Sequence, residues 1–251
     1  GKSAEFEKGL STLEAVTGAS SSEMERLSKL AKELGSTTAF TATQVLELQT
    51  NLAKLGFKTT EIEDATASIL DLAASLEVGL GEAAEFSGSI VKSFGLTTEE
   101  TSRVVDVMAK STSSSALNFE GLRESLKLVA PVAKATGNSI EKTTALLGVL
   151  ADRGLKGSIA GTGLSQTFVE LNKKGLTLEQ AMTKVSQSSN KLGTAMKLVG
   201  TRGGRALLTL ADGRKDIEGL EQTFLKSAGA AKEMADIRLD NLAGDTTILA
   251  S

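Results

Sequence analysis

The sequence contains no cysteine, histidine, tryptophan or tyrosine, and it contains a single proline. Without cysteine the chain forms no disulfide and offers neither a thiolate nucleophile nor a zinc–thiolate site. Without histidine it lacks the most common general base and metal ligand of proteins. An enzyme would have to work with Asp, Glu, Lys, Arg, Ser or Thr alone. The composition therefore favours a protein that is not an enzyme and that holds no cofactor or metal.

Charge of one sign and long apolar runs are also missing. The 251 residues carry 28 basic and 31 acidic side chains, a net charge of −3, and no block of like charge stands out. Because binding to a nucleic-acid backbone usually requires a basic face, this balance argues against sequence-specific nucleic-acid binding. No window approaches the ~20 apolar residues that span a bilayer, and there is no signal-peptide pattern. The chain begins with Gly rather than Met, so we expect a part of a longer protein, whose other parts make any membrane contact.

Apolar residues recur at three- and four-residue intervals along nearly the whole chain. One such stripe runs from Ile62 to Leu76, and it is typical of a helix that faces a core. Strand-like alternation is scarce. We therefore predict an all-α fold, a multi-helix domain of about eight to eleven short helices in which some neighbouring spans merge. The predicted spans are 3–16, 21–34, 42–55, 61–77, 81–94, 98–112, 118–136, 140–152, 156–172, 178–187, 190–199, 202–211 and 215–250.

Three of these spans carry a further expectation. Pro131 lies inside the span 118–136 and removes a helical hydrogen bond, so it should kink or split that helix. The last span should break near Gly229. The polar run Ser111–Ser115 precedes the span that starts at 118, and its hydroxyl-rich composition indicates a loop.

Helix starts and ends are marked by recurrent local signals. A hydroxyl or amide residue followed three positions later by Glu or Gln fits a capping box, in which each side chain accepts a backbone N–H of the other residue. A glycine after an apolar run fits the left-handed position that closes a helix. The predicted caps are Thr41–Gln44, Thr60–Glu63, Thr97–Glu100, Asn138–Glu141 and Thr177–Gln180, and the predicted stops are Gly35, Gly56, Gly95, Gly137 and Gly175.

The last four of these glycines are spaced at nearly regular intervals. Each is followed by a cap, an acidic or amide residue and an apolar stripe, at intervals of about 40 residues. Two helices in each interval would make the chain an array of helical hairpins. Any all-helical chain with short links repeats such signals, so the alternative is a domain without a true repeat.

Composition suggests four segments. Residues 1–34 form N-terminal helices that lead into a core at 35–199, which is dense in apolar stripes. A small helical junction at 200–227 begins with a flexible basic stretch. The segment 228–251 is rich in alanine and charge and has only a thin apolar seam. Such a seam suits a helix that extends into a coiled coil, or equally a last helix that lies on its own domain.

Three stretches invite a chemical interpretation. Gly154–Gly163 combines glycines with Lys156 and Ser158, but a phosphate-binding loop needs Gly-Lys directly before Ser or Thr and a preceding strand. The small residues Gly157, Ala160, Gly161 and Gly163 rather let a helix approach a neighbour closely. Arg202 and Arg205 could hold an anion near a helix start, or could be solvated arginines at a helix junction. The acidic groups at 61–64 and 99–100 lie in first helical turns, where they complement the helix dipole rather than bind a metal.

Several stretches in succession resemble the core region of phage tail tape measure proteins, a phage-related minor tail protein family. The resemblance covers roughly residues 30–170, through the stretches 34–57, 61–96, 101–137 and 146–164, and AKEMADIRLDNLAGD at 231–245 is similar to the helical exit of that region. At Gly163-Leu-Ser-Gln the family more often has Ala-Leu-Arg, which puts a basic role there in doubt. The family-motif residues in this chain are Thr38, Phe40, Thr41, Gln44, Gly56, Phe57, Gly95, Pro131, Gly137, Gly154, Gly157, Gly161 and Thr162.

The resemblance implies a structural protein of the virion tail, made in the host cytoplasm and located in the tail tube lumen or tip. Its length would set tail length; it would be anchored at the tail tip or baseplate during assembly and released on DNA ejection. The implied partners are tail tip or baseplate hub proteins, the tail tube protein, tail assembly chaperones and further copies of itself about the tail axis. The residues alone also allow a non-catalytic helical-repeat scaffold that binds a peptide or protein partner, and, as a third hypothesis, a cell-wall-degrading enzyme whose site the sequence does not show.

Overall fold

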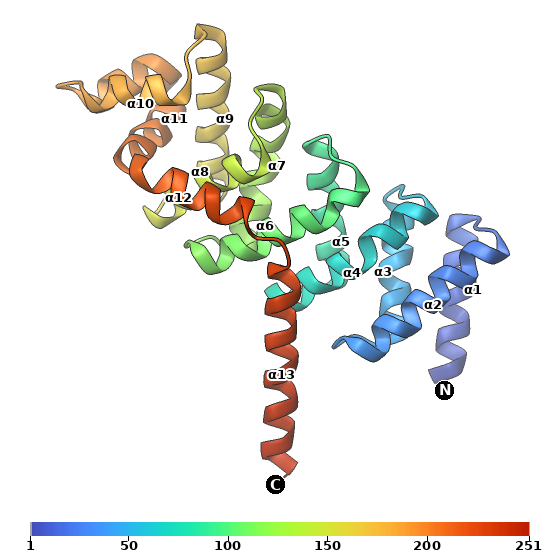
Figure 1. Cartoon of the computed structure of the whole chain (residues 1–251). Helices are drawn as coiled ribbons and strands as arrows, with labels where there is room; N and C mark the ends of the chain where they lie inside the picture. The colour runs from blue at the N-terminus through green and yellow to red at the C-terminus, as the bar shows by residue number, and fades with distance from the viewer. Residues whose placement is uncertain (1, 251) are drawn as a thin grey trace. The chain divides into compact units, whose positions relative to one another are not determined.

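The computed structural model describes residues 2–250, with side chains described for residues 4–244. This part of the chain is all-α, as predicted, and contains thirteen α-helices and one 3-10 turn but no strand (Figure 1). Fewer helices were expected because some predicted neighbours were thought to merge. The helices are α1 (Lys2–Thr17), α2 (Ser21–Thr37), α3 (Ala42–Lys54), α4 (Thr59–Leu76), α5 (Leu80–Ser93), η1 (Thr98–Glu100), α6 (Thr101–Ser114), α7 (Phe119–Ala135), α8 (Ile140–Asp152), α9 (Gly157–Lys174), α10 (Leu178–Ser186), α11 (Lys191–Asp212), α12 (Arg214–Leu225) and α13 (Ala230–Ala250).

Two of the predicted capping boxes are complete. At the start of α3 the Gln44 N–H donates to the Thr41 hydroxyl over 3.1 Å, and the Thr41 N–H donates to Gln44 Oε1 over 2.8 Å. Thr177 and Gln180 make the same pair of bonds at the start of α10. At η1 the carboxylate of Glu100 accepts the Thr97 N–H over 3.0 Å. These bonds occupy N–H groups that the first helical turn leaves without acceptors.

The other two predicted caps were wrong by one or two residues. Helix α4 starts at Thr59, so Thr60 lies inside it; the Lys58 N–H donates to Glu61 Oε1 over 2.8 Å at the true start. Helix α8 is capped by the hydroxyl of Ser139, which accepts the Lys142 N–H over 3.0 Å, so Asn138 lies outside the cap. At α8 the neighbouring hydroxyl accepts the first-turn N–H, whereas at α4 the start is marked only by the Glu61 carboxylate that accepts the Lys58 N–H.

Four of the five predicted stops are left-handed glycines. Gly56, Gly95, Gly137 and Gly175 have φ of 92°, 67°, 77° and 64° and follow α3, α5, α7 and α9. The residue after each glycine donates its N–H to a carbonyl five positions back, as Phe57 does to Leu52 over 3.0 Å. Each interval of about 40 residues therefore contains two helices, as the spacing predicts.

Gly35 does not end a helix; this prediction was wrong. It lies inside α2, and a Cβ at this position would lie 2.6 Å from the backbone nitrogen of Ala42. The glycine is there because α2 and the first residue of α3 approach closely, not because the chain turns.

The remaining expectations met mixed outcomes. Helix α7 continues past Pro131, which therefore does not split it. Ser111–Ser114 belongs to α6, so the predicted loop is wrong there. The predicted spans 190–199 and 202–211 form one element, α11, but Gly200 interrupts it with φ 81° and ψ 179°. The break predicted near Gly229 separates α12 from α13.

Packing divides the described chain into two compact units. Unit 1 comprises the residues up to Val91, Leu96–Ala109 and the residues from Gly229 onward; unit 2 comprises Lys92–Gly95 and Lys110–Ala228. The four segments suggested by composition remain a prediction.

In unit 1, helices α1 and α2 pack on α3, and α4 packs on α2, α3 and α13. Its core contains the fully buried side chains of Leu13, Leu27, Leu46, Leu52, Ile62 and Ile69. In unit 2, α9 lies between α7 and α11 and packs on both, while α12 packs on α8 and α10 on α11. Its core contains Leu122, Leu126, Leu146, Leu150, Leu164 and Leu207.

Candidate functional site

Small residues allow α9 to pack closely between its two neighbours. A Cβ on Gly161 would lie 2.7 Å from the carbonyl oxygen of Ser125 in α7. A Cβ on Gly163 would lie 2.9 Å from Ala206 Cβ in α11. Real Cβ atoms do not come this close to backbone atoms, so only glycine fits at Gly161. The predicted close approach of this helix is therefore confirmed.

A buried hydroxyl adds a polar contact to the α9–α11 packing. Thr167 is fully buried, and its hydroxyl lies 2.8 Å from the carbonyl oxygen of Gly163 and 3.2 Å from that of Gly203. The second oxygen belongs to α11. Because Gly203 has no side chain, its backbone can reach the Thr167 hydroxyl. The α7–α9–α11 layer is thus held by backbone proximity along its length.

The start of α9 does not have the geometry of a phosphate-binding loop. It follows helix α8 rather than a strand, and Lys156 precedes Gly157 as the cap residue. Gly154 and Gly157 have φ of 87° and 61°, which a side chain would strain. A Cβ on Gly157 would also lie 2.5 Å from Glu124 Oε2. These glycines serve the turn from α8 into α9.

The first family-motif residues lie together in the link between α2 and α3. The Thr38 hydroxyl donates to the Leu34 carbonyl over 2.6 Å and accepts the Phe40 N–H over 3.2 Å. Thr41 and Gln44 form the capping box that follows. Phe40 also lines a cavity of about 170 Å³ together with residues of α4 and α13.

The other motif residues end helices or pack against them. Phe57, just after Gly56, is buried, and its ring lies 3.3 Å from where a Cβ of Gly88 in α5 would lie. Thr162 lines a cavity between α9 and α11. The motif residues from Thr38 to Phe57 belong to unit 1, and those from Gly95 to Thr162 belong to unit 2. The set is therefore divided between the two units, and its family role remains a prediction.

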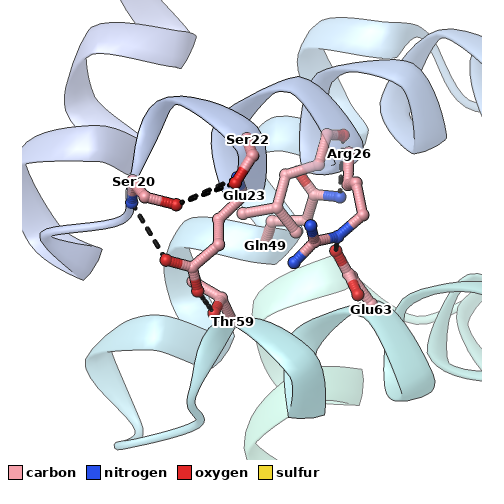
Figure 2. Close-up of polar contacts among 8 residues, drawn as sticks. Ser20, Ser22, Glu23, Arg26, Gln49, Thr59 and Glu63 are labelled. Carbon is pink, nitrogen blue, oxygen red and sulfur yellow. Dashed lines mark hydrogen bonds and ion pairs between the residues drawn. The ribbon is translucent and has the colours of Figure 1, made fainter.

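A set of polar contacts joins α2 to α3 and α4 in unit 1 (Figure 2). Glu23 accepts the Ser20 N–H over 3.0 Å in a capping box that the sequence analysis missed, and it also accepts the Thr59 hydroxyl. The Thr59 hydrogen bond, with those from Ser20, lowers the pKa of Glu23 to about 2. Arg26 Nε donates to Glu63 Oε1 over 2.8 Å. These contacts fix the α2 start against the α4 start.

Helix α13 is held in unit 1 by hydrogen bonds at its start and by the side chain of Arg238 further along the helix. The carboxylate of Asp106 accepts the N–H groups of Gly229 and Ala231 over 2.9 and 3.0 Å, and so caps the helix. Arg238 Nε donates to the Ser75 carbonyl over 2.8 Å, and Arg238 Nη1 lies 2.8 Å from Glu77 Oε1. These contacts cannot be predicted from the sequence, because no local pattern links Asp106 to a helix more than a hundred residues later.

One acidic side chain beside α13 has an altered pKa. Burial raises the pKa of Asp71 to about 6; the carboxylates of Asp236 and Asp106 act in the same direction, and the Lys232 ammonium opposes them. Asp71 lines the same cavity of about 170 Å³ as Phe40. Lys232 itself pairs with Asp236, one turn along α13, over 2.9 Å.

The described residues contain neither a candidate metal-binding group nor a candidate membrane-spanning helix. Among them, no group of three or more acidic side chains lies close enough to hold a metal ion. In the same part of the chain, no helix is both long and apolar enough to cross a bilayer. The features described above are contacts between helices, which are typical of a structural protein, and the comparisons with known proteins agree with this interpretation.

The chain matches the family described as phage-related minor tail protein over residues 28–243. It belongs to this family. The particular relatives are tape measure proteins. The chain is 32% identical to the tape measure protein of Pneumococcus phage Dp-1 over 267 aligned positions, which cover 95% of this chain and 23% of that protein.

A second relative is a probable tape measure protein of Escherichia phage P2, 31% identical over 275 positions, which cover 96% of this chain and 34% of that protein. The chain therefore spans about a quarter to a third of the length of these relatives. A comparison with solved structures gives no significant match.

Proposed function

We propose that this chain is a compact helical domain of a tape measure protein, and that the protein of which it is part sets the length of a phage tail. The observation that carries this proposal is the family match over residues 28–243, together with two tape measure relatives that align with nearly the whole chain. The all-α fold agrees with it, because a continuous helix rises 1.5 Å per residue and so converts residue number into length.

In this proposal the domain anchors or plugs one end and does not itself measure. Its helices are short and lie against one another within each unit, so adding a residue to a link would not lengthen the particle. The domain would contact the tail tip or baseplate hub, the tail tube protein and tail assembly chaperones, and would leave with or before the DNA. It would lie in the tube lumen or at the tip after assembly in the host cytoplasm.

Helix α13 is the element best suited to self-association about the tail axis. It has 21 residues, about 30 Å of helix. Ile237 and Leu242 are 53% and 59% exposed on it. Exposed apolar residues on a long helix favour pairing with further helices, so we propose that copies of α13 pair as a coiled coil.

Tail length in the phage that encodes the full protein tests this function. Inserting about 40 helix-forming residues into an extended helical part outside residues 28–243 should lengthen the tail by about 60 Å in electron micrographs. Inserting the same number of Gly and Ser residues into the exposed link between α1 and α2 should leave tail length unchanged.

Unchanged tails after the first insertion would contradict the measuring role of the whole protein. Equal lengthening by both insertions would contradict the proposal that this domain does not measure. A free-standing peptide-binding scaffold is the competing function; it predicts normal tails when the chain is deleted from the phage, whereas our proposal predicts no tails of normal length.

A further inference from the structure

A cavity of about 330 Å³ opens between α9 and α11 in unit 2. Arg202 and Arg205 line it from α11, and Ser158, Ile159 and Thr162 line it from α9, with Leu155 just before that helix. Its lining includes no acidic residue. Thr201 and Ala206 of α11 complete the lining, so the cavity combines two guanidinium groups with three hydroxyls and an apolar wall.

These two arginines differ from every other arginine of the chain. Of eight arginines, the six others form ion pairs with carboxylates: Arg26, Arg103, Arg123, Arg153, Arg214 and Arg238. Within the described part of the chain, no carboxylate pairs with Arg202 or Arg205. An arginine presents five N–H donors in a fixed planar arrangement that suits carboxylate and phosphate. Two such groups beside one cavity leave it with a positive charge that the protein does not neutralise.

The backbone explains why both guanidiniums lie at the same cavity. Gly200, with φ 81°, interrupts α11, and the helical run that follows begins next to the cavity. Arg202 and Arg205 are three positions apart in that run, so they lie on one face of the helix. The close approach of Gly163 to Ala206 brings α9 alongside this face. Ser158 and Thr162, four positions apart, share one face of α9 in the same way.

The apolar wall limits the class of ligand. Ile159 is 58% exposed, whereas the two other isoleucines of unit 2, Ile140 and Ile217, are buried. A ligand that covers Ile159 would therefore gain hydrophobic free energy. A nucleic-acid backbone needs a wide basic surface, whereas this chain has a net charge of −3 and the cavity holds two cations. A ligand with a carboxylate next to an aliphatic side chain matches the two arginines and the apolar wall of the cavity.

We propose that this cavity binds a peptide segment of a partner protein in which an Asp or Glu stands beside a Leu or Ile. The carboxylate lies between Arg202 and Arg205 and accepts hydrogen bonds from them, and the hydroxyls of Ser158 and Thr162 donate to the same group or to the peptide carbonyls. The aliphatic side chain packs on Ile159 and Leu155. This inference goes beyond the proposed function, because it depends only on the cavity and not on a role of the protein in setting tail length.

The arginine side-chain N–H signals in nitrogen–proton NMR spectra of the whole chain provide the test. The probes are the acetylated, amidated peptide Leu-Asp-Glu-Leu-Ile and its neutral counterpart Leu-Asn-Gln-Leu-Ile. We expect the acidic peptide to shift the Nε–H signals of Arg202 and Arg205 at millimolar concentration or below, and the neutral peptide to bind roughly tenfold more weakly. The signals of the six paired arginines should not move.

A matched pair of variants separates the site from general charge. R202Q/R205Q should weaken binding of the acidic peptide roughly tenfold or more. K191Q/K197Q also removes two positive charges, but from exposed positions of α11 outside the cavity. This variant should bind the acidic peptide like the unaltered chain. Thermal unfolding of both variants shows that each is folded.

Four outcomes would overturn the proposal. They are equal binding of the neutral peptide, equal loss of binding in K191Q/K197Q, no shift of either arginine signal, or tighter binding of inorganic phosphate or a single-stranded oligonucleotide than of the acidic peptide. The last outcome would assign the cavity to a phosphate rather than to a protein partner.

Discussion

Helices α9 and α13 show two different ways in which this protein holds a helix in place. In unit 2, glycines bring the backbone of α9 against both α7 and α11, and the contact runs along the helix. In unit 1, α13 packs on α4 but is fixed by separate hydrogen bonds to Asp106 and by those of Arg238. Close packing fails as a whole when an atom is added, whereas separate hydrogen bonds can be removed one at a time. We therefore expect α9 to unfold only with its unit and α13 to detach locally.

The largest effect is expected from adding one carbon to α9. Gly161→Ala places a Cβ 2.7 Å from the Ser125 carbonyl oxygen, which neither backbone can avoid without moving. Overpacking of this kind costs about 1–3 kcal/mol, and backbone contact puts Gly161→Ala at the upper end. The midpoint and slope of urea unfolding measure the loss.

Gly219 provides the matched control, because it is an exposed glycine in α12 with nothing within 4 Å of an added Cβ. Gly219→Ala should stabilise the protein by about 0.5–1 kcal/mol, since alanine is the better helix former. The Gly→Ala substitution thus changes the free energy of unfolding in opposite directions at the two positions. Equal effects would show that α9 is not closely packed.

Removing the cap of α13 should have the second largest effect. Asp106→Ala leaves the N–H groups of Gly229 and Ala231 without their acceptor, and loss of such a cap costs about 1–2 kcal/mol. Hydrogen exchange should accelerate in α13 and remain unchanged in α9. Asp106→Asn keeps one acceptor oxygen and should recover part of the protection; a uniform acceleration across both helices would contradict local detachment.

The pH dependence of stability should show the cost of charging Asp71. Its pKa is raised from 3.8 to about 6 in the folded protein. The folded state therefore binds more protons than the unfolded state between these values, and the stability present below the lower pKa is lost as pH rises through about 6. Asp71→Asn should stabilise the protein by about 1 kcal/mol near neutral pH, a value reduced for the partial exposure of the group.

The same substitution should have little effect well below pH 3.8, where Asp71 is protonated in both states. Urea unfolding at a series of pH values measures the difference between the variant and the unaltered chain. A stabilisation that is independent of pH would show that packing, not charge, causes it.

Loss of the Arg238 contacts should have the smallest effect. Arg238→Met keeps much of the aliphatic length but removes the hydrogen bond to the Ser75 carbonyl and the exposed ion pair with Glu77. We expect a cost of about 0.5 kcal/mol, most of it from the bond to Ser75. Raising the salt concentration should remove only a small contribution of the Arg238–Glu77 ion pair to the stability of the unaltered chain, because Glu77 is exposed.

Local signals predicted most of the helix boundaries, and distant contacts account for what they missed. Thr41 and Thr177 were predicted correctly because a glutamine follows each by three residues and completes the capping box. Asn138 was preferred over the adjacent Ser139, although the Ser139 hydroxyl makes the cap. Gly35 was taken for a stop, whereas its role is a close approach to Ala42.

The end of helix α4 was predictable without such a signal. The helix ends at Leu76, one residue from the predicted end at 77, although no glycine marks the end and Glu77, a residue with a side chain, adopts φ 56° there.

The candidate site was only partly visible in the sequence. The small residues of α9 indicated close packing, and the structure shows the neighbours that they contact. Arg202 and Arg205 were noticed as a pair that could hold an anion. What the sequence could not show is that the other six arginines find carboxylates, or that Ile159 of α9 lies at the same cavity.

Native-state hydrogen exchange at low urea concentrations tests the contrast between α9 and α13 most directly. The account predicts that the amides of α9 exchange only through unfolding of unit 2, with a free energy that falls as urea rises. It predicts that the amides from Ala231 to Leu239 exchange at a lower free energy that hardly depends on urea. If the α13 amides instead share the free energy and urea dependence of the α4 amides, α13 is an integral part of unit 1 and the proposed local detachment is wrong.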